Sequence, residues 1–437
     1  SRAMVKLGWH SLGTSFDCPC GIRHELPIEA CYLGEGAAAR LAAFAREKCG
    51  KTCLIVSDAN TRHAGGERLL SALSGAGKTC TEHVFGSDPF EATEELGEVV
   101  ARAGMDADFF VGLGSGTLCD LAKYAGHKLK RPTLLYATAA SMNGYTSSIV
   151  AMKIRGLKRT SPVQPALGVF ADPDVVATAP IKMAAAGVGD FLSKNSSSSD
   201  WYAAHFLRDE YYCSRPGDFF EGTQEKLLEA APRVARRDPE AVGIVLEALL
   251  LAGFSMVVAG SSAPASGGEH LISHYLDMKH ATKKTPNDLH GAQVGVATVY
   301  TLELWEKVLA LDPARIDPEA LAGAHPDDET IHRWIDADWG SVGPEVWAQW
   351  QQKTRDREGL RREIERFRDG LPALRDALKK ELLPSATVAE AIRASGGAVD
   401  AEGLLAPVEE YRNAQRFARY LRNRFTILDL AAELGVT

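Results

Sequence analysis

The chain has 437 residues, of which 45% are hydrophobic and 24% are charged, and its formal net charge is −8. At roughly 150 residues per domain, this length predicts two or three domains with a core large enough to fold without a disulfide or a metal. The composition is typical of a globular protein and excludes a mainly disordered chain, a collagen and a small disulfide scaffold, and the acidic balance argues against nucleic acid as a partner.

The first 180 residues alternate short apolar runs with amphipathic stretches. We expect strands at residues 30–33, 52–57, 82–85, 109–113, 133–137 and 167–170. We expect helices at residues 36–48, 66–72, 91–103 and 117–127. Strands that alternate with helices predict parallel βαβ units, and residues 147–154 and 158–163, joined by a short Arg-Gly turn, predict a hairpin inserted in that pattern. The first domain, residues 1–180, is therefore expected to be α/β.

From residue 181 the pattern changes to long amphipathic windows without strand signals. We expect helices at residues 224–234, 239–259, 291–309, 355–369, 388–395 and 408–421. Breaks rich in proline and aspartate at residues 312–317 and 325–328 predict loops. The second domain, residues 181–437, is therefore expected to be all-helical. Its most apolar window, residues 243–260, carries Glu247, and we interpret it as a buried helix and not as a membrane span.

Eight cysteines are present, and seven of them fall in the first third of the chain. Their spacing predicts no disulfide framework, so we expect free thiols in a reducing cytoplasm. No basic segment followed by an apolar stretch marks the N-terminus, which predicts no signal peptide. Cys18, Cys20 and His24 can bind a metal or react with oxidants, but no second pair of ligands follows as in a structural zinc module. We interpret this segment as a turn of surface thiols.

A glycine-rich segment, residues 112–117 (GLGSGT), overlaps the end of the strand predicted at 109–113 and opens a helix. Glycines allow the backbone to approach an anion closely, and the free N–H groups at a helix start point at a phosphate. The third glycine of the dinucleotide fingerprint is missing, so a tight turn without a ligand is the alternative. Asp58 follows the strand at 52–57, where an acidic residue accepts hydrogen bonds from a ribose or caps a helix.

His270, His274 and His290 lie close together in the sequence, in a chain with twelve histidines. His270 and His274 are four residues apart and share one face of a helix. Imidazoles and a carboxylate hold a divalent catalytic metal with one position open for substrate, and Asp190 can supply the carboxylate. Histidines on a helix surface are the alternative interpretation.

Several short motifs occur in a specific order along the chain. They are Gly114-Ser115-Gly116-Thr117 with Asp120, residues 138–141 (TAAS), Gly189-Asp190 with Ser193-Lys194, Glu269-His270 with Ser273-His274, and His290-Gly291 with Val294-Gly295. As an ordered set, and together with the tail at residues 418–431 (ARYLRNRFTILDLA), they resemble the glycerol-1-phosphate dehydrogenases. This family lies within the superfamily of iron-type alcohol dehydrogenases, glycerol dehydrogenases and dehydroquinate synthases. The resemblance covers nearly the whole chain from about Glu25.

The resemblance implies a Rossmann-like nucleotide-binding domain, a helical metal-binding domain of the dehydroquinate synthase type, and a cleft between them. It implies NAD(H) or NADP(H) as cofactor and a divalent metal, usually zinc, with nickel and iron as alternatives. The implied metal ligands are Asp190, His270 and His290, and His274 is implied to contact the substrate. The residues implied to bind the cofactor are Asp58 and Asn60 near the adenosine ribose, Gly114, Ser115, Gly116, Thr117 and Leu118 around the pyrophosphate, Asp120 in the same segment, and Thr138, Ser141 and Ser147 further along.

One residue departs from the family pattern. The family's Asn-Asp-Gly after Thr-Ala-Ala-Ser reads Met142-Asn143-Gly144 here, so an amide stands where a carboxylate contacts the substrate. Asn143 keeps the size and a hydrogen-bonding capacity but lacks the charge. The implied substrate is thus dihydroxyacetone phosphate, reduced to sn-glycerol 1-phosphate, or a close phosphorylated or phosphonate analogue.

The implied chemistry is hydride transfer from NAD(P)H to a carbonyl carbon, with the metal as Lewis acid. Lys194, one helical turn from Asp190, can face the anion of the substrate, and a solvated lysine is the alternative. Further candidate cations are Lys153, Arg155, Lys279, Lys283 and Lys284. The alternative functions are a lyase or cyclase of dehydroquinate synthase type, which uses NAD transiently, and a glycerol or alcohol dehydrogenase. We expect a cytoplasmic homo-oligomer without nucleic-acid or membrane partners.

Overall fold

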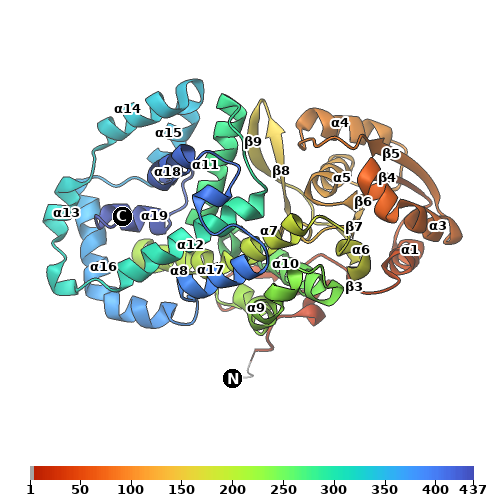
Figure 1. Ribbon diagram of the computed structural model, residues 1–437. Helices are drawn as coiled ribbons and strands as arrows, with labels where there is room; N and C mark the ends of the chain where they lie inside the picture. Colours follow the sequence, from red (N-terminus) through yellow and green to blue (C-terminus); the bar gives the residue numbers. More distant parts are fainter. Residues whose placement is uncertain (1–3) are drawn as a thin grey trace.

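A computed structural model describes residues 4–437 and contains two halves of different architecture (Figure 1). The N-terminal half is built around a parallel sheet, drawn on the right of Figure 1, and the C-terminal half consists of helices, drawn mainly on the left. The predicted combination of an α/β unit with a helical unit is confirmed.

The sheet has six strands in the order β3-β10-β7-β6-β4-β5, and every neighbouring pair is parallel. The strands are β3 (Ala30–Leu33), β4 (Thr52–Asp58), β5 (Thr79–Phe85), β6 (Phe109–Gly114), β7 (Thr133–Ala137) and β10 (Gly168–Ala171). β6 and β7 are buried along their whole length, as their unbroken apolar runs predict for strands with both faces covered. All six correspond to predicted strands. The prediction missed the first residues of β5, because they are polar and half-exposed and lack the apolar run of a buried strand.

Helices cover both faces of this sheet. The helices of this half are α1 (Ala37–Lys48), α2 (Ala59–Thr61), the π-turn η2 (Arg62–Gly66), α3 (Glu67–Gly75), α4 (Glu94–Ala103), α5 (Gly116–Leu129) and α6 (Pro173–Val176). α1 and α3 pack on the face that contains Cys53 and Ile55 of β4, and α4 and α5 pack on the face that contains Leu54 and Val56. Alternate residues of one strand therefore serve two separate apolar layers.

The predicted hairpin is present as two antiparallel strands outside the main sheet, β8 (Ile149–Ile154) and β9 (Leu157–Pro162). Arg155 and Gly156 between them have φ of 53° and 84°, as a two-residue type I′ turn requires. The hairpin also contacts the helical half, because Lys158 Nζ lies 2.9 Å from Asp277 Oδ2. It thus joins the two halves next to the cavity described below.

The second half contains helices and short 3₁₀ turns. They are α7 (Ile181–Leu192), α8 (Lys194–Arg208), η3 (Arg215–Phe220), α9 (Thr223–Val234), α10 (Pro239–Ala259), η4 (Ala263–Ala265), α11 (Gly268–Lys283), α12 (His290–Leu309), η5 (Pro313–Arg315), α13 (Pro318–Ala324), α14 (Asp328–Trp339), η6 (Gly340–Val342), α15 (Gly343–Gln351), α16 (Arg357–Leu378), α17 (Ser385–Ala394), η7 (Ala401–Gly403), α18 (Val408–Phe417), η8 (Ala418–Tyr420) and α19 (Ile427–Glu433). Every predicted helix range of this half is occupied by a helix. Outside those ranges lie α7, α8, α11, α13 to α15 and α19.

α10 is long and apolar enough to cross a membrane by length and composition, and it is the one such helix among residues 4–437. However, 83% of its most apolar window is buried inside the protein. Its neighbours are α7, α9 and η3, and Ala241, Val245 and Leu249 belong to one apolar cluster with residues of α7 and α9. The expectation of a buried core helix is met.

Glycines allow α7 and α12 to approach each other closely. A Cβ at Gly291 would lie 2.0 Å from the carbonyl oxygen of Ala186, and a Cβ at Gly189 would lie 2.6 Å from that of Gly291. Neither carbonyl can yield without moving a helix backbone. This close contact places Asp190, near the end of α7, beside His290, at the start of α12.

The first described residues pack on the helical half. A short hairpin, β1 (Ser15–Asp17) and β2 (Arg23–Glu25), precedes the main sheet. After it, Leu26 and Ile28 pack against Phe219 of η3 and Phe254 of α10. Residues 4–28 therefore lie against the C-terminal half, while a domain boundary at residue 180 remains a prediction for the rest of the chain.

Candidate active site

A cavity of about 820 Å³ lies where the carboxyl ends of the sheet strands meet α11 and α12. From the sheet side it is lined by the start of α5 and the loop after β7, and from the helical side by α11 and the start of α12. Ligands of open parallel sheets bind at this edge. Among the predicted residues that line it are Ser115, Gly116, Thr117, Asn143, His270 and His290.

Three helices bring Asp190, His270 and His290 together. Asp190 Oδ1 lies 3.3 Å from His270 Nε2 and 3.6 Å from His290 Nε2. This oxygen is buried and has no hydrogen-bond partner among the described residues. A buried carboxylate oxygen without a donor is costly unless a cation faces it, so the donor set and its geometry fit a divalent metal.

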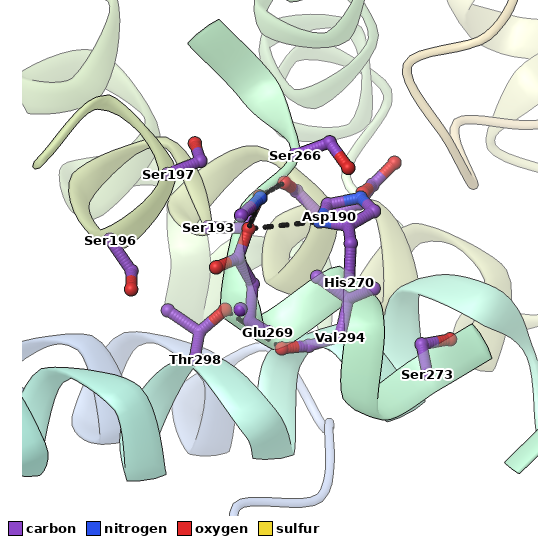
Figure 2. A network of polar contacts seen from close by, with 12 residues as sticks. Asp190, Ser193, Ser196, Ser197, Ser266, Glu269, His270, Ser273, Val294 and Thr298 are labelled. Carbon is purple, nitrogen blue, oxygen red and sulfur yellow. Dashed lines mark hydrogen bonds and ion pairs between the residues drawn. The ribbon is translucent and has the colours of Figure 1, made fainter. Parts of the chain in front are cut away.

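Glu269 orients His270 for this role. Its Oε1 lies 2.9 Å from His270 Nδ1 and also accepts a hydrogen bond from the backbone N–H of Gly267. With Nδ1 donating to the carboxylate, the lone pair of Nε2 is directed to the side of Asp190. Figure 2 shows Asp190, Glu269 and His270 together among the hydroxyl side chains of the surrounding helices. Sequence reasoning did not single out Glu269, although it stands directly before His270 in the motif.

The charges of this group favour a bound cation. Burial by itself raises the pKa of Asp190, but the neighbouring imidazoles of His270 and His290 hold that pKa well below its usual range. Burial lowers the pKa of His270, and the neighbouring carboxylates of Asp190 and Glu269 raise it to about 9. The two buried carboxylates thus favour a positive charge on His270. In histidine-carboxylate sites a metal ion supplies this charge in place of the proton.

His274, Lys158 and Arg422 line the cavity beside these residues. Burial, followed by the charge of Arg422, lowers the pKa of His274 well below its usual range, and its Nδ1 is buried without a hydrogen-bond partner. The charge of Lys158 is balanced by Asp277. Arg422, by contrast, makes no side-chain hydrogen bond or ion pair with any of residues 4–437, and burial lowers its pKa. Arg422 is therefore a cation left for an anion, and its only signal in the sequence is the C-terminal motif.

The start of α5 forms the second wall of the cavity. Ser115 is its N-cap residue, and its side chain makes no capping hydrogen bond. The first N–H groups of the helix are therefore left for a ligand, as the phosphate-cradle interpretation requires. Ser141 and Asp120 also line the cavity. Asp120 accepts a hydrogen bond from Ala151 N–H in β8, and burial, partly offset by Lys123, raises its pKa to about 6.

Four predicted cofactor residues offer no free side-chain group to the cavity. Three lie outside its lining, and the hydroxyl of the fourth is bonded to the backbone. Gly114, Leu118 and Thr138 lie behind the lining, where Thr138 N–H donates to the Gly114 carbonyl at 3.0 Å. Ser147 lines the cavity, but its hydroxyl lies 3.2 Å from the carbonyl oxygens of both Gly144 and Ile149. Their predicted contacts with the cofactor remain predictions.

Asp58 and Asn60 lie outside the cavity lining, at the carboxyl end of β4. Asp58 caps the helical segment that begins with α2, since its Oδ1 accepts the N–H of Thr61 at 2.8 Å. The Thr61 hydroxyl in turn accepts the N–H of Asp58. The helix-cap alternative for Asp58 is thus present, and its contact with a ribose remains a prediction.

Replacing Asp58 with alanine is expected to lower the free energy of unfolding by about 1 kcal/mol, because the cap is lost. Asp58→Asn is the matched control, since asparagine caps a helix as well as aspartate does. Urea denaturation measures both. An alanine variant as stable as the wild type would contradict the capping role, and a raised KM for NADH in either variant would support the ribose contact.

The structure does not place Lys194 at the cavity. Lys194 is buried at the start of α8, and its Nζ lies 5.4 Å from the ring centroid of Phe220. α7 ends at Leu192 and Lys194 begins α8, so the two residues belong to different helices, and Lys194 does not line the cavity. Of the other candidate cations, Lys153 lines the cavity, whereas Arg155, Lys279, Lys283 and Lys284 do not.

Comparisons with known proteins agree with this geometry. Residues 32–180 match the profile of the iron-containing alcohol dehydrogenase family. A glycerol-1-phosphate dehydrogenase [NAD(P)+] of Geobacillus stearothermophilus is 32% identical over 67% of this chain and 73% of its own length. One of Halalkalibacterium halodurans is 34% identical over 66% of this chain and 74% of its own length.

Solved structures give the same fold. A putative alcohol dehydrogenase from Ralstonia eutropha superposes with a TM-score of 0.57 at 16% identity, over 94% of this chain and 97% of the other. At this identity the likeness concerns the fold alone, and it confirms the predicted fold class.

Proposed function

Since this chain belongs to the glycerol-1-phosphate dehydrogenase family of iron-type oxidoreductases, we propose that it reduces a phosphorylated ketone with NAD(P)H. The substrate we propose is dihydroxyacetone phosphate, which would give sn-glycerol 1-phosphate. One observation carries the proposal: the Asp190-His270-His290 group lies at the same cavity as the free helix start at Ser115.

We assign the metal to Asp190, His270 and His290, with zinc as the proposed ion, since two imidazoles and a carboxylate leave one tetrahedral position for substrate. When bound there, the ion supplies Lewis-acid polarisation of a carbonyl oxygen. Glu269 keeps His270 in the ligating tautomer, and the backbone N–H of Asn143 holds the second oxygen of Asp190 at 2.9 Å. These contacts preorganise the site before substrate enters.

The backbone N–H groups at Ser115, Gly116 and Thr117 are proposed to bind the pyrophosphate of the dinucleotide. The reduced nicotinamide supplies the hydride. Gly116 and Gly144 both lie against the Met142 side chain, which a Cβ at either position would meet at 2.9–3.0 Å.

Arg422 is proposed to bind the substrate phosphate with its unpaired guanidinium. An arginine matches phosphate oxygens with paired N–H donors. Burial and the charge of Arg422 hold the pKa of His274 well below its usual range. The neutral imidazole can therefore donate its N–H proton to the new hydroxyl oxygen while its other nitrogen accepts a proton from water. Phosphate binding by Arg422 orients the carbonyl end of the substrate toward His270 and His290.

The test is turnover of NADH and NADPH by metal-reconstituted protein, with dihydroxyacetone phosphate run beside dihydroxyacetone. We expect turnover of the phosphate ester that a chelator abolishes and added zinc restores. Equal turnover of both ketones would indicate a glycerol or alcohol dehydrogenase. Binding of cofactor and metal without net NADH consumption would overturn a reductase and favour a reaction that uses NAD transiently.

Asn143→Asp tests whether the amide changes the substrate. We expect turnover of dihydroxyacetone phosphate to stay within about tenfold, or ~1.4 kcal/mol, because the side-chain size and the backbone contact with Asp190 are kept. The measurement is kcat/KM, with Asn143→Ala as the control that removes the side-chain contact. A gain well beyond tenfold in the aspartate variant would show that the wild-type cavity accepts a different phosphorylated carbonyl.

A further inference from the structure

A second group of metal-binding side chains lies outside the active site. It contains Cys18, Cys20, His24 and Cys213, whose ligand atoms all lie within 4.8 Å of one another. The first three come from the hairpin of β1 and β2, and Cys213 comes from the loop between α8 and η3. The sequence separates these two segments by about 190 residues, so the spacing of the cysteines does not reveal the group.

The distances in this group match those of a tetrahedral zinc site. Zinc bonds of about 2.3 Å to sulfur and roughly 2.0 Å to nitrogen place two sulfurs about 3.8 Å apart and a sulfur and a nitrogen about 3.5 Å apart. In the protein, the Sγ atoms of Cys18 and Cys213 are 3.8 Å apart. His24 Nε2 lies 3.3 Å from Cys20 Sγ and 3.6 Å from Cys213 Sγ.

His24 is fixed in the tautomer that binds a metal. It is 1% exposed, and its Nδ1 lies 2.6 Å from the carbonyl oxygen of Val258, to which it donates. The proton is therefore on Nδ1, and the lone pair of Nε2 points at the sulfurs. A backbone carbonyl that holds the second nitrogen of a histidine is the usual outer contact of a metal ligand.

A tight turn joins the two cysteines of the hairpin to His24. Between the first two cysteines and His24, Gly21 has a φ of 90°, and its N–H donates to the Cys18 carbonyl at 3.0 Å. This tight turn directs both sulfurs of the hairpin to one side.

We propose that Cys18, Cys20, His24 and Cys213 bind a structural zinc ion. Four protein ligands fill a tetrahedral shell and leave no position for substrate, unlike the three at the active site. A disulfide of Cys18 with Cys213 would use two of the three sulfurs and would leave the imidazole lone pair unused. The expectation of surface thiols at residues 18–24 is corrected by their burial, because Cys18 and Cys20 are half-buried and His24 is buried.

The ion ties the N-terminal hairpin to the helices behind the active site. Tyr211, two residues before Cys213, accepts the indole N–H of Trp201 at 2.8 Å through its carbonyl. The neighbouring Asp200 accepts the N–H of Gly268, the first residue of α11, at 2.8 Å. The zinc site therefore stabilises the region that positions α11 and takes no direct part in the reaction.

Cobalt(II) substitution of the full chain tests the site. Thiolate ligands give a cobalt charge-transfer band in the near ultraviolet, and the Asp190-His270-His290 group has no sulfur, so the band reports the second site alone. We expect the band in the wild type, its loss in Cys213→Ser, and its retention in Cys49→Ser, a cysteine outside the group. Zinc content by mass spectrometry should be one equivalent lower in Cys213→Ser than in Cys49→Ser.

His270→Ala separates this proposal from the proposed function. It should lose metal from the active site and keep the thiolate band, whereas the reverse holds for Cys213→Ser. A reduced wild-type protein without the band would overturn the zinc site, even if Cys213→Ser failed to fold. A zinc-free protein with a Cys18–Cys213 disulfide, detected by non-reducing peptide mapping, would overturn it equally.

Discussion

His270→Ala is expected to lower kcat/KM by at least ~10³-fold and to remove the active-site metal. The loss of one imidazole leaves two ligands, and Lewis-acid stabilisation supplies several kcal/mol, of which ~4 kcal/mol corresponds to this factor. Glu269 and Asp190 would also lose their shared partner, which lies within 3.3 Å of both. The measurements are steady-state NADH consumption and metal content of the same preparation.

His332→Ala is the matched control for this variant. His332 stacks on Trp347 with centroids 4.0 Å apart and lies outside the cavity lining. Its replacement should change neither metal content nor turnover. If His270→Ala retained full activity, the metal assignment would be wrong, and a circular-dichroism spectrum like that of the wild type would show that loss of activity in the variant is not loss of the fold.

Arg422→Met is expected to lower kcat/KM for the phosphorylated ketone by about 10²-fold, mostly through KM. Loss of a desolvated charged hydrogen-bonding partner costs about 2–5 kcal/mol, and ~2.7 kcal/mol corresponds to this factor. Turnover of unphosphorylated dihydroxyacetone should remain at the wild-type level, because nothing in that substrate would contact the guanidinium. Methionine keeps the apolar stem that packs in the cavity wall.

Arg416→Met is the matched control, since Arg416 lies over the rings of Trp334 and Phe417 and not at the cavity. It should leave both substrates unaffected. Equal losses for the two ketones in Arg422→Met would indicate damage to the site as a whole. An unchanged KM for the phosphate ester would assign the phosphate to another cation, with Lys158 and Arg424 next to be replaced.

The alternation of strands and helices in the first half was predictable because each strand is a short apolar run bounded by turns. β3 and β7 begin and end at the predicted residues. Helix α10 was equally clear, since its long apolar stretch begins at Pro239 and stops before Gly260. α13 to α15 were not predicted, because they mix apolar with charged residues and their hydrophobic period is hard to see.

Some functional residues were likewise predictable from local patterns in the sequence, and others were not. The spacing of His270 and His274 placed both on one helix face, and both line the cavity. The glycine-rich segment predicted the helix start at Ser115 from local chemistry. Lys194 does not line the cavity, because a four-residue spacing predicts a shared face only within one helix, and α7 ends before α8 begins at Lys194.

The sequence by itself determined the fold class, the helix start that can cradle phosphate, and the order of motifs, since these depend on local patterns. Only the tertiary structure decided which distant side chains meet. Asp190 lies beside His290 because glycines let the backbones of α7 and α12 pack directly against each other. Cys213, in the loop after α8, lies beside the hairpin that carries Cys18. Arg422 is free for an anion because the nearby carboxylate of Glu345 pairs with Arg159. Such encounters follow from packing between elements, which residue spacing along one chain does not encode.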